Sequence, residues 1–308
     1  MNILAVILII LLVFVLIMTA AGIYFCQKSL SRNWKKGIIY TTKDRIYQTA
    51  DVDWFENNHR ETEIKSSRGL KQIGYVFEHE EKTDYWIIAV HGYSSQARNI
   101  ANHIKGFYNM GYNVVAPELM GMGKSEGDFV AMAGYDAEDL ILWIDRLNKE
   151  HPEAKIGLFG VSMGAATVMN SLGKGVSDNV EFFIEDSGYT NLKGEIMFQL
   201  KYIYHLNFPP IMWFADIVCK IKYGYFFGDV NAEPALAKIK IPGLILHGDA
   251  DDFVPPEFAE KAYGLMTGPK EIKYFKGSKH IRAEHWFRDE YWNTIRLFLE
   301  KYSSKEDV

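Results

Sequence analysis

Residues 155–166 read KIGLFGVSMGAA, and they contain the strongest structural signal of the chain. The run from Lys155 to Phe159 is short and apolar, as in a buried β-strand, and the small residues after Gly164 are typical of a closely packed helix. Between them, Gly160-Val161-Ser162-Met163-Gly164 matches Gly-x-Ser-x-Gly, which is a weak signal by itself in a chain with 25 glycines. Its place between a strand and a helix predicts a sharp turn that exposes the Ser162 hydroxyl. Side chains at Gly160 and Gly164 would collide in so tight a turn.

Apolar runs of strand length alternate with helical periodicity on both sides of this turn. Strands are predicted at residues 71–78, 85–90, 112–116, 155–159, 180–184, 241–246 and 271–275. Helices are predicted at residues 47–58, 100–109, 136–149, 163–172, 255–265 and 284–302. The alternation predicts an α/β fold, with a mostly parallel, doubly wound sheet that has helices on both faces. Functional groups are then expected in the loops at the carboxyl ends of the strands.

Residues 189–237 interrupt the alternation. They are rich in large aromatics, are broken by Pro209 and Pro210, and lie between two predicted sheet strands. This pattern predicts an inserted helical cap. Most of its aromatics are expected to pack the cap onto the sheet, and a few to line an acyl or aromatic pocket. The candidates for the pocket are Phe198, Tyr202, Phe208 and Trp213.

The segment from Ile3 to Phe25 is almost continuously apolar. A helix of about 20 such residues can cross a bilayer. A cleaved signal peptide is the alternative, but no Lys or Arg precedes the run and the run is longer than a usual signal core. We therefore expect one uncleaved transmembrane helix in residues 1–27, a tether and lead-in at 28–62, and an α/β domain at 63–308.

Basic residues follow the apolar segment and none precedes it. They are Lys28, Arg32, Lys35 and Lys36. The positive-inside tendency predicts that they, and the domain after them, lie in the cytoplasm. A single helix before a large domain can defy this tendency, so an extracytoplasmic domain is the alternative.

Composition excludes several classes of function. The net charge of −5 and the dispersed Lys and Arg residues argue against a nucleic-acid surface. The two cysteines, Cys26 and Cys219, make a disulfide framework or a Cys-x-x-Cys site unexpected. His280 and His285 lack the spacing of a zinc helix. We predict neither a metal nor a cofactor.

The stretch Gly121-Met122-Gly123-Lys124-Ser125 ends in Gly-Lys-Ser, as a phosphate-binding loop does. Such a loop has a further glycine at the position that Glu118 occupies here. Phosphate binding is therefore rejected.

A serine hydroxyl needs a base to remove its proton, and the base is commonly a His oriented by a carboxylate. In folds with this turn the chain order is Ser, acid, His. His280 follows the last predicted strand in a loop and is favoured over His285, which falls in the closing helix. The acid stays open on position alone. The candidates are Asp186, Asp249, Asp251 and Asp252.

The tetrahedral intermediate of acyl transfer needs backbone N–H donors for its oxyanion. Met163 directly follows Ser162, and Tyr93 follows the strand at residues 85–90, so their amides are the predicted donors. His91 and His247 each precede a glycine at a strand end. Because the chain order already selects His280, these two are expected to make structural hydrogen bonds.

Together these motifs resemble the α/β-hydrolase superfamily, most closely the bacterial branch grouped with serine aminopeptidase-like and lysophospholipase-like proteins. The resemblance covers about residues 73–302 and rests on segments 91–92, 117–125, 160–164, 247–255 and 277–280. It implies that the acid is the Asp of a His-Gly-x-x-Asp-x-x-Val-Pro pattern, here Asp251, and that Tyr93 and Met163 form the oxyanion hole. Relatives commonly have Arg where this chain has Met120 and Asp where it has Glu118. These departures bear on the substrate.

These features predict a serine hydrolase that cleaves a carboxylic ester through Ser162, His280 and Asp251. A lipid-derived acyl ester is favoured, since the anchor would hold the site near a bilayer. A peptidase or thioesterase could use the same residues. A binding protein that retains the fold without catalysis is the alternative from another class.

Overall fold

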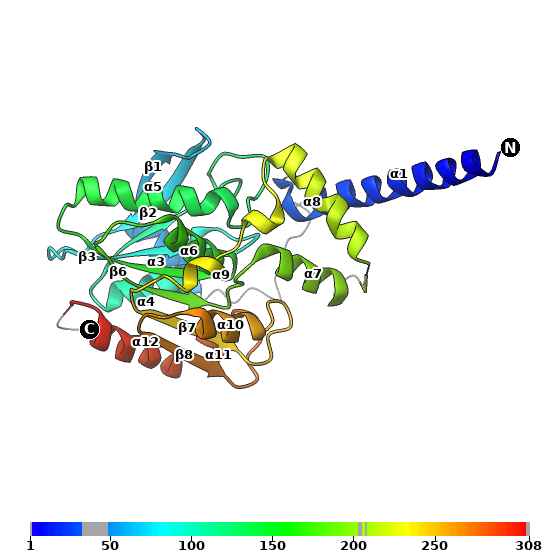
Figure 1. Ribbon diagram of the computed structural model, residues 1–308. Helices are drawn as coiled ribbons and strands as arrows, with labels where there is room; N and C mark the ends of the chain where they lie inside the picture. The colour runs from blue at the N-terminus through cyan, green and yellow to red at the C-terminus, as the bar shows by residue number, and fades with distance from the viewer. Residues whose placement is uncertain (1, 33–48, 203–204, 207, 306–308) are drawn as a thin grey trace.

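The computed structural model describes residues 2–32, 49–202, 205–206 and 208–305. In these residues an eight-stranded sheet has the strand order β1-β2-β4-β3-β5-β6-β7-β8 (Figure 1). The strands are β1 (Arg60–Lys65), β2 (Lys71–Phe77), β3 (Tyr85–Val90), β4 (Asn113–Pro117), β5 (Lys155–Val161), β6 (Val180–Asp186), β7 (Gly243–Gly248) and β8 (Lys270–Phe275). β2 pairs antiparallel with β1 and β4, and the remaining pairs are parallel. The predicted mostly parallel α/β sheet is confirmed.

Alternating side chains build one core on each face of the sheet. On β3, Ile87 and Ala89 belong to one core, and Ile88 and Val90 to the other. The first face is covered by α3 (Thr49–Asn58), α4 (Ala101–Asn109), α11 (Ala283–Trp286) and α12 (Arg288–Tyr302). The second face is covered by α5 (Gly134–Glu150), α6 (Met163–Lys174), α9 (Glu233–Leu236) and α10 (Glu257–Leu265). This is the doubly wound arrangement that the sequence predicts.

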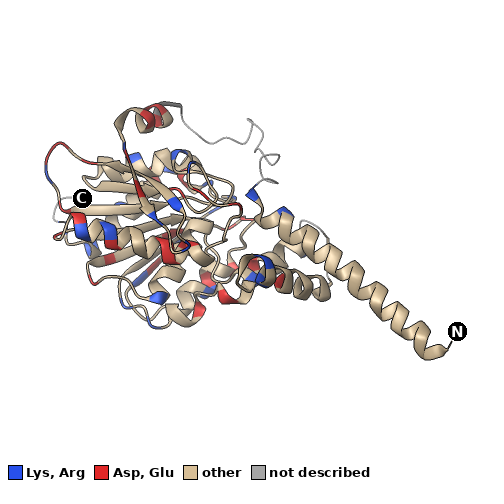
Figure 2. Ribbon diagram, turned by 90° about the horizontal axis from the view of Figure 1, so that it is seen from above, with Lys and Arg blue, Asp and Glu red and all other residues tan. Residues whose placement is uncertain are grey.

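The chain between β6 and β7 includes α7 (Leu192–Tyr202) and α8 (Pro209–Tyr223), which lie away from the sheet (Figure 1). α8 packs against α1 (Ile3–Leu30), the long N-terminal helix that projects from the body in both views (Figures 1 and 2). Gly22, Cys26 and Leu30 of α1 are buried, so its last turns are part of the folded body.

The end of α1 is also tied to the loop after β4 by hydrogen bonds. The Val130 amide donates to the Leu30 carbonyl at 2.8 Å. The Arg32 guanidinium donates to the carbonyls of Ser125 and Gly127, each at 3.2 Å. These bonds fix where the helix leaves the body.

Two parts of the fold differ from expectation. β1 begins at Arg60, so the last residues of the predicted lead-in belong to the sheet, while the helix predicted at residues 47–58 is present as α3 and buries Phe55 in the core. β1 is a charged, largely exposed edge strand, which gives no apolar signal. The closing helix is two helices, α11 and α12, separated at Phe287, where the backbone leaves the helical region. Most of the predicted tether, residues 33–48, lies outside the described residues.

Gly74 on β2 makes room for a tryptophan of α5. A Cβ at Gly74 would lie 2.5 Å from the Trp143 ring, closer than real Cβ contacts. The ring is held there because its N–H donates to Gln72 Oε1 at 3.1 Å. Trp143 therefore packs flat against the main chain of β2.

We predict that Gly74→Ala lowers the free energy of unfolding by about 1–3 kcal/mol, since overpacking forces the ring from its site. Gly264→Ala on α10 is the matched control, because nothing lies within 4 Å of its added Cβ. That change should be neutral or stabilise by up to about 1 kcal/mol. Thermal unfolding of both variants in detergent checks this. Equal midpoints for the two would contradict the packing described.

Candidate active site

Ser162 occupies the turn between β5 and α6. Its φ of 56° and ψ of −117° are unusual for a residue with a side chain. Such a conformation costs about 1–3 kcal/mol and persists only when its surroundings enforce it. Here the main chain packs tightly. A Cβ on Gly160 would overlap the Gly164 main chain, and one on Gly164 would overlap the Val90 carbonyl. The Ser162 amide donates to the Asp186 carbonyl at 2.7 Å, which ties the turn to β6.

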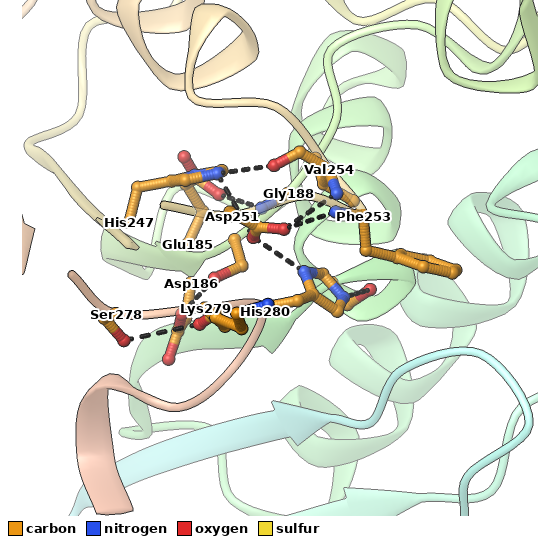
Figure 3. Close-up of polar contacts among 12 residues, drawn as sticks. Glu185, Asp186, Gly188, His247, Asp251, Phe253, Val254, Ser278, Lys279 and His280 are labelled. Carbon is orange, nitrogen blue, oxygen red and sulfur yellow. Dashed lines mark hydrogen bonds and ion pairs between the residues drawn. The ribbon is translucent and has the colours of Figure 1, made fainter. Parts of the chain in front are cut away.

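Two side chains from other strand ends form a chain of hydrogen bonds that begins at this serine. Ser162 Oγ lies 2.9 Å from His280 Nε2, and His280 Nδ1 lies 2.8 Å from Asp251 Oδ2 (Figure 3). The Asp251 side chain is fully buried, and its Oδ1 accepts from the Phe253 and Val254 amides, each at 2.9 Å. With Nδ1–H donating to Asp251, Nε2 of His280 is the acceptor that faces the hydroxyl.

The structure separates the four candidate acids. Of these four carboxylates, Asp251 is the one that is hydrogen-bonded to His280. The other carboxylates have different partners: Asp186 with Tyr291 and Ser187, Asp249 with the Gly277 amide, and Asp252 with Lys279. The Asp252 side chain is exposed, and its pKa is lowered chiefly by the hydrogen bond from Lys279.

The other histidines near the strand ends bond to the main chain. His91 Nε2 accepts from the Leu119 amide at 3.1 Å, which leaves Nδ1–H to donate to the Gly92 carbonyl at 2.9 Å. His247 Nε2 lies 2.9 Å from the Val254 carbonyl, and burial lowers the pKa of His247. His285 is exposed on α11. None of these three is the hydrogen-bond partner that the structure gives the Ser162 hydroxyl.

The predicted oxyanion donors lie beside the serine. Met163 is the first residue of α6, and the first amides of a helix have no partner within it. Tyr93 follows Gly92, where an added Cβ would lie 3.2 Å from Ser162 Cβ and 3.8 Å from its Oγ. A side chain at Gly92 would be in tight contact with Ser162, so glycine favours the close approach of this loop to the serine from the end of β3.

Two cavities of about 310 Å³ each meet at Ser162, a size common for small-molecule sites. The first is mostly apolar and lies between α1, α7, α8 and the serine. The second is more polar and includes His103, Lys279, His280 and Arg282. In His103 both ring nitrogens are buried without a hydrogen-bond partner among the described residues, and burial lowers its pKa. Ser162 thus faces an apolar space on one side and a polar space on the other.

The predicted pocket residues are not the ones that line these cavities. Tyr202, Phe208 and Trp213 are 55%, 45% and 60% exposed, and neither they nor Phe198 is among the lining residues. Tyr202, Phe208 and Trp213 are thus exposed on the segment between β6 and β7, whereas Phe198 is partly buried and packs against the Tyr202 ring. The apolar cavity is instead lined by other aromatic residues and by aliphatic ones, among them Phe25, Phe227, Phe253, Ile196, Leu200 and Ile211.

The contribution of α1 to the cavity was missed. One signal exists in the sequence, since Gly22 and Cys26 are small residues four apart in an otherwise bulky apolar helix. Small residues at this spacing are typical of close helix packing in membranes.

A metal site is absent among the described residues, where no group of three or more His, Cys, Asp or Glu side chains could hold an ion.

Buried carboxyl groups surround the site. Glu185 ends β6 below the serine turn, and burial raises its pKa to about 8. Its Oε2 accepts from the Gly188 amide at 2.8 Å, and Oε1 has no partner among the described residues. Glu195 lines the apolar cavity, and burial raises its pKa to about 8 as well. At neutral pH both groups are therefore largely protonated.

We predict that the protein loses stability as the pH rises towards 8. An unfolded Glu has a pKa of about 4.3, so between that value and the folded pKa the folded state retains a proton that the unfolded state releases. For Glu185 this lowers the free energy of unfolding by up to about 1.4 kcal/mol per pH unit. Thermal midpoints from about pH 5 to about pH 8 should fall, and Glu185→Gln should reduce the slope.

Glu181→Gln is the matched control, because this residue lies on the same strand and is only half-buried. Its pH dependence should equal that of the wild-type protein. If Glu185→Gln kept the wild-type slope, Glu185 would not be protonated in the folded protein.

The chain is similar in sequence to several known proteins. A family model described as serine aminopeptidase, S33, matches residues 81–184. The uncharacterized protein YqkD of Bacillus subtilis is 28% identical over 246 residues, which are 79% of this chain and 80% of that protein. Lysophosphatidylserine lipase ABHD12 of Xenopus tropicalis is 24% identical over 172 residues, 54% of this chain and 42% of the lipase.

Solved structures have the same architecture. The esterase Pf2001 of Pyrococcus furiosus superposes with a TM-score of 0.65 at 23% identity, covering 83% of this chain and 96% of the esterase. Its likeness, with the strand order and the serine turn described above, identifies the fold. The chain is a member of the α/β-hydrolase superfamily.

Proposed function

We propose that this protein is a serine hydrolase that cleaves a carboxylic ester, with Ser162 as nucleophile. The observation that supports it most strongly is the pair of hydrogen bonds from Ser162 through His280 to Asp251, at 2.9 and 2.8 Å. A nucleophile, a base and a carboxylate in this order are the arrangement of serine hydrolases on many folds.

The geometry suits a two-step reaction. His280 Nε2 takes the proton of Ser162 as Oγ attacks the ester carbonyl carbon, and Asp251 stabilises the imidazolium that forms. The Tyr93 and Met163 amides donate to the oxyanion. When the carbon–oxygen bond of the ester breaks, His280 gives its proton to the leaving alcohol. Water, deprotonated by His280, then attacks the acyl-serine and releases the acid and free Ser162.

An ester fits the surroundings better than a peptide. The family description names an aminopeptidase, and Glu195 is a carboxyl group in the cavity that could face a peptide ammonium. However, burial raises the pKa of Glu195 to about 8, so at neutral pH it offers little countercharge. The apolar cavity favours an acyl chain, and two relatives are named as an esterase and a lipase.

We also propose that α1 is retained as a membrane anchor. It has the length and hydropathy of a membrane span, and its most apolar window is not buried in the protein. Its last turns line the apolar cavity through Phe25 and Cys26, so removal of a signal peptide would take away part of the cavity wall. Lys28 and Arg32 follow the apolar segment, which favours a cytoplasmic domain.

Hydrolysis of 4-methylumbelliferyl butyrate by the full-length protein tests the ester proposal. Ser162→Ala should lower kcat/KM by roughly four orders of magnitude or more. Asp251→Asn should lower it by about four orders of magnitude, because His280 loses the partner that sets its tautomer. Asp252→Asn is the matched control: its carboxylate is next along the chain but pairs with Lys279, so activity should change less than threefold, roughly the effect of an exposed ion pair.

An aminoacyl p-nitroanilide serves as the competing substrate. Faster cleavage of the amide than of the ester, through the same Ser162, would sink the ester assignment in favour of a peptidase. Absence of any Ser162-dependent hydrolysis would favour a binding protein that retains the fold.

A further inference from the structure

The outward face of α8 is apolar. Trp213, Ile217 and Ile221 follow one another at intervals of four residues and are 60%, 50% and 81% exposed. Residues four apart share one face of a helix. The other face, which includes Ile211 and Ala215, is buried. A continuous row of exposed apolar side chains is typical of a surface that binds a protein or a membrane.

α8 packs in parallel along the last turns of α1. A Cβ on Gly22 would lie 2.9 Å from the Ala215 amide nitrogen, so the two backbones approach closely there. One turn further along both helices, the buried Cys26 and Cys219 side chains contact each other. Because the two contacts come in the same order, the helices run in the same direction. Paired residues therefore lie at the same level along α1.

This alignment gives both helices the same polarity gradient. On α1 the apolar run gives way to Tyr24 and then Lys28. Trp213 precedes the first contact on α8, so it lies beside the apolar part of α1. Lys220 and Lys222 follow Cys219 of the second contact, as Lys28 follows Cys26 on α1. Tryptophan and tyrosine at the interface, with lysines on the aqueous side, are typical of membrane proteins.

Two further exposed aromatics adjoin this row. Tyr202 ends α7 and Phe208 directly precedes α8, and they are 55% and 45% exposed. Both therefore belong to the end of the segment where α8 begins. We define the membrane face as Tyr202, Phe208, Trp213, Ile217 and Ile221. It includes three of the aromatics that the sequence had suggested for a substrate pocket.

The same helices bound the apolar cavity at Ser162. Phe25 belongs to α1, Leu200 to α7 and Ile211 to α8, and all three line the cavity. The space beside the serine is thus bounded by the elements that form the membrane face. A chain that passes between these helices would meet mostly apolar side chains.

We propose that the membrane face lies in the interfacial region of the bilayer, and that a lipid ester reaches Ser162 sideways, its acyl chain passing between α1, α7 and α8. The inference rests on the proposed ester hydrolysis. The substrate class is a membrane lipid whose ester bond lies close to its polar head. In such a lipid the ester carbonyl can be at Ser162 while the acyl chain occupies the apolar cavity. The second, more polar cavity receives the alcohol.

Two esters with the same leaving group test this route in full-length protein reconstituted in phosphatidylcholine vesicles. 4-Methylumbelliferyl oleate resides in the bilayer, whereas 4-methylumbelliferyl butyrate is presented from water. The double change Trp213→Lys and Ile217→Lys places two charges on the membrane face, where burial of each in the apolar region is costly. We expect the rate on the oleate to fall about tenfold or more, with less than about a twofold change on the butyrate.

Leu297→Lys is the matched control, because Leu297 is 51% exposed on α12, away from α1 (Figure 1). It should leave both rates unchanged. If the double variant changed the rates on the two esters by the same factor, the lateral route would be wrong, but the proposed esterase activity would be unaffected. If the wild-type protein cleaved neither ester, the proposed function itself would fail.

A second measurement does not depend on activity. Lipids brominated near the head-group end of their chains quench tryptophans that lie at that depth. The loss of tryptophan fluorescence caused by the brominated lipids should be larger in the wild-type protein than in Trp213→Phe. This variant keeps an aromatic ring on the membrane face. Equal quenching of the two proteins would place Trp213 outside the bilayer and overturn the inference.

Discussion

The strained turn at Ser162 is the constraint on which the site depends. A non-glycine residue keeps a φ of 56° only if the surrounding structure enforces this backbone conformation. Gly160 and Gly164 let β5, β3 and α6 approach until their main chains touch, and the Asp186 carbonyl holds the Ser162 amide. The hydroxyl is thereby lifted above the sheet and placed at the start of α6, where backbone amides point towards it.

Parallel strand order brings the other groups to the same place. Loops after β3, β7 and β8 meet at one edge because the carboxyl ends of parallel strands share it. Asp251 is held by two backbone amides and so presents a fixed oxygen to His280. The ring is then oriented by one bond and faces the hydroxyl with the other nitrogen. Rigid main-chain contacts, rather than long flexible side chains, set this geometry.

Sequence reasoning found what depends on local pattern. The apolar runs at β3 and β5, the glycines of the serine turn and the positions of Ser162 and His280 are readable from the chain. Asp251 was selected among four candidate acids only by the family resemblance, because position alone does not distinguish them. β1 was missed because an exposed charged edge strand lacks apolar alternation. The direction of the aromatics in residues 189–237 was also unreadable. A segment whose aromatics pack into a core and one whose aromatics are exposed can have the same composition, and only the structure shows which side chains are buried.

The apolar helix α1 therefore has two roles in the mechanism proposed here. It holds the hydrolase at the membrane, and its last turns, through Phe25 and Cys26, form part of the wall beside the nucleophile. A soluble esterase of the same fold needs no such wall. The coupling between anchor and cavity would make the bilayer part of the substrate route.

Covalent labelling tests the proposed mechanism most directly. Full-length protein in detergent is treated with a fluorophosphonate, which reacts with a serine only when a base activates it, and the labelled peptide is mapped by mass spectrometry. We predict a single adduct on Ser162 that is lost in Ser162→Ala and forms far more slowly in a folded His280→Ala variant. A wild-type protein that stays unlabelled, or an adduct that persists in Ser162→Ala, would contradict the assignment.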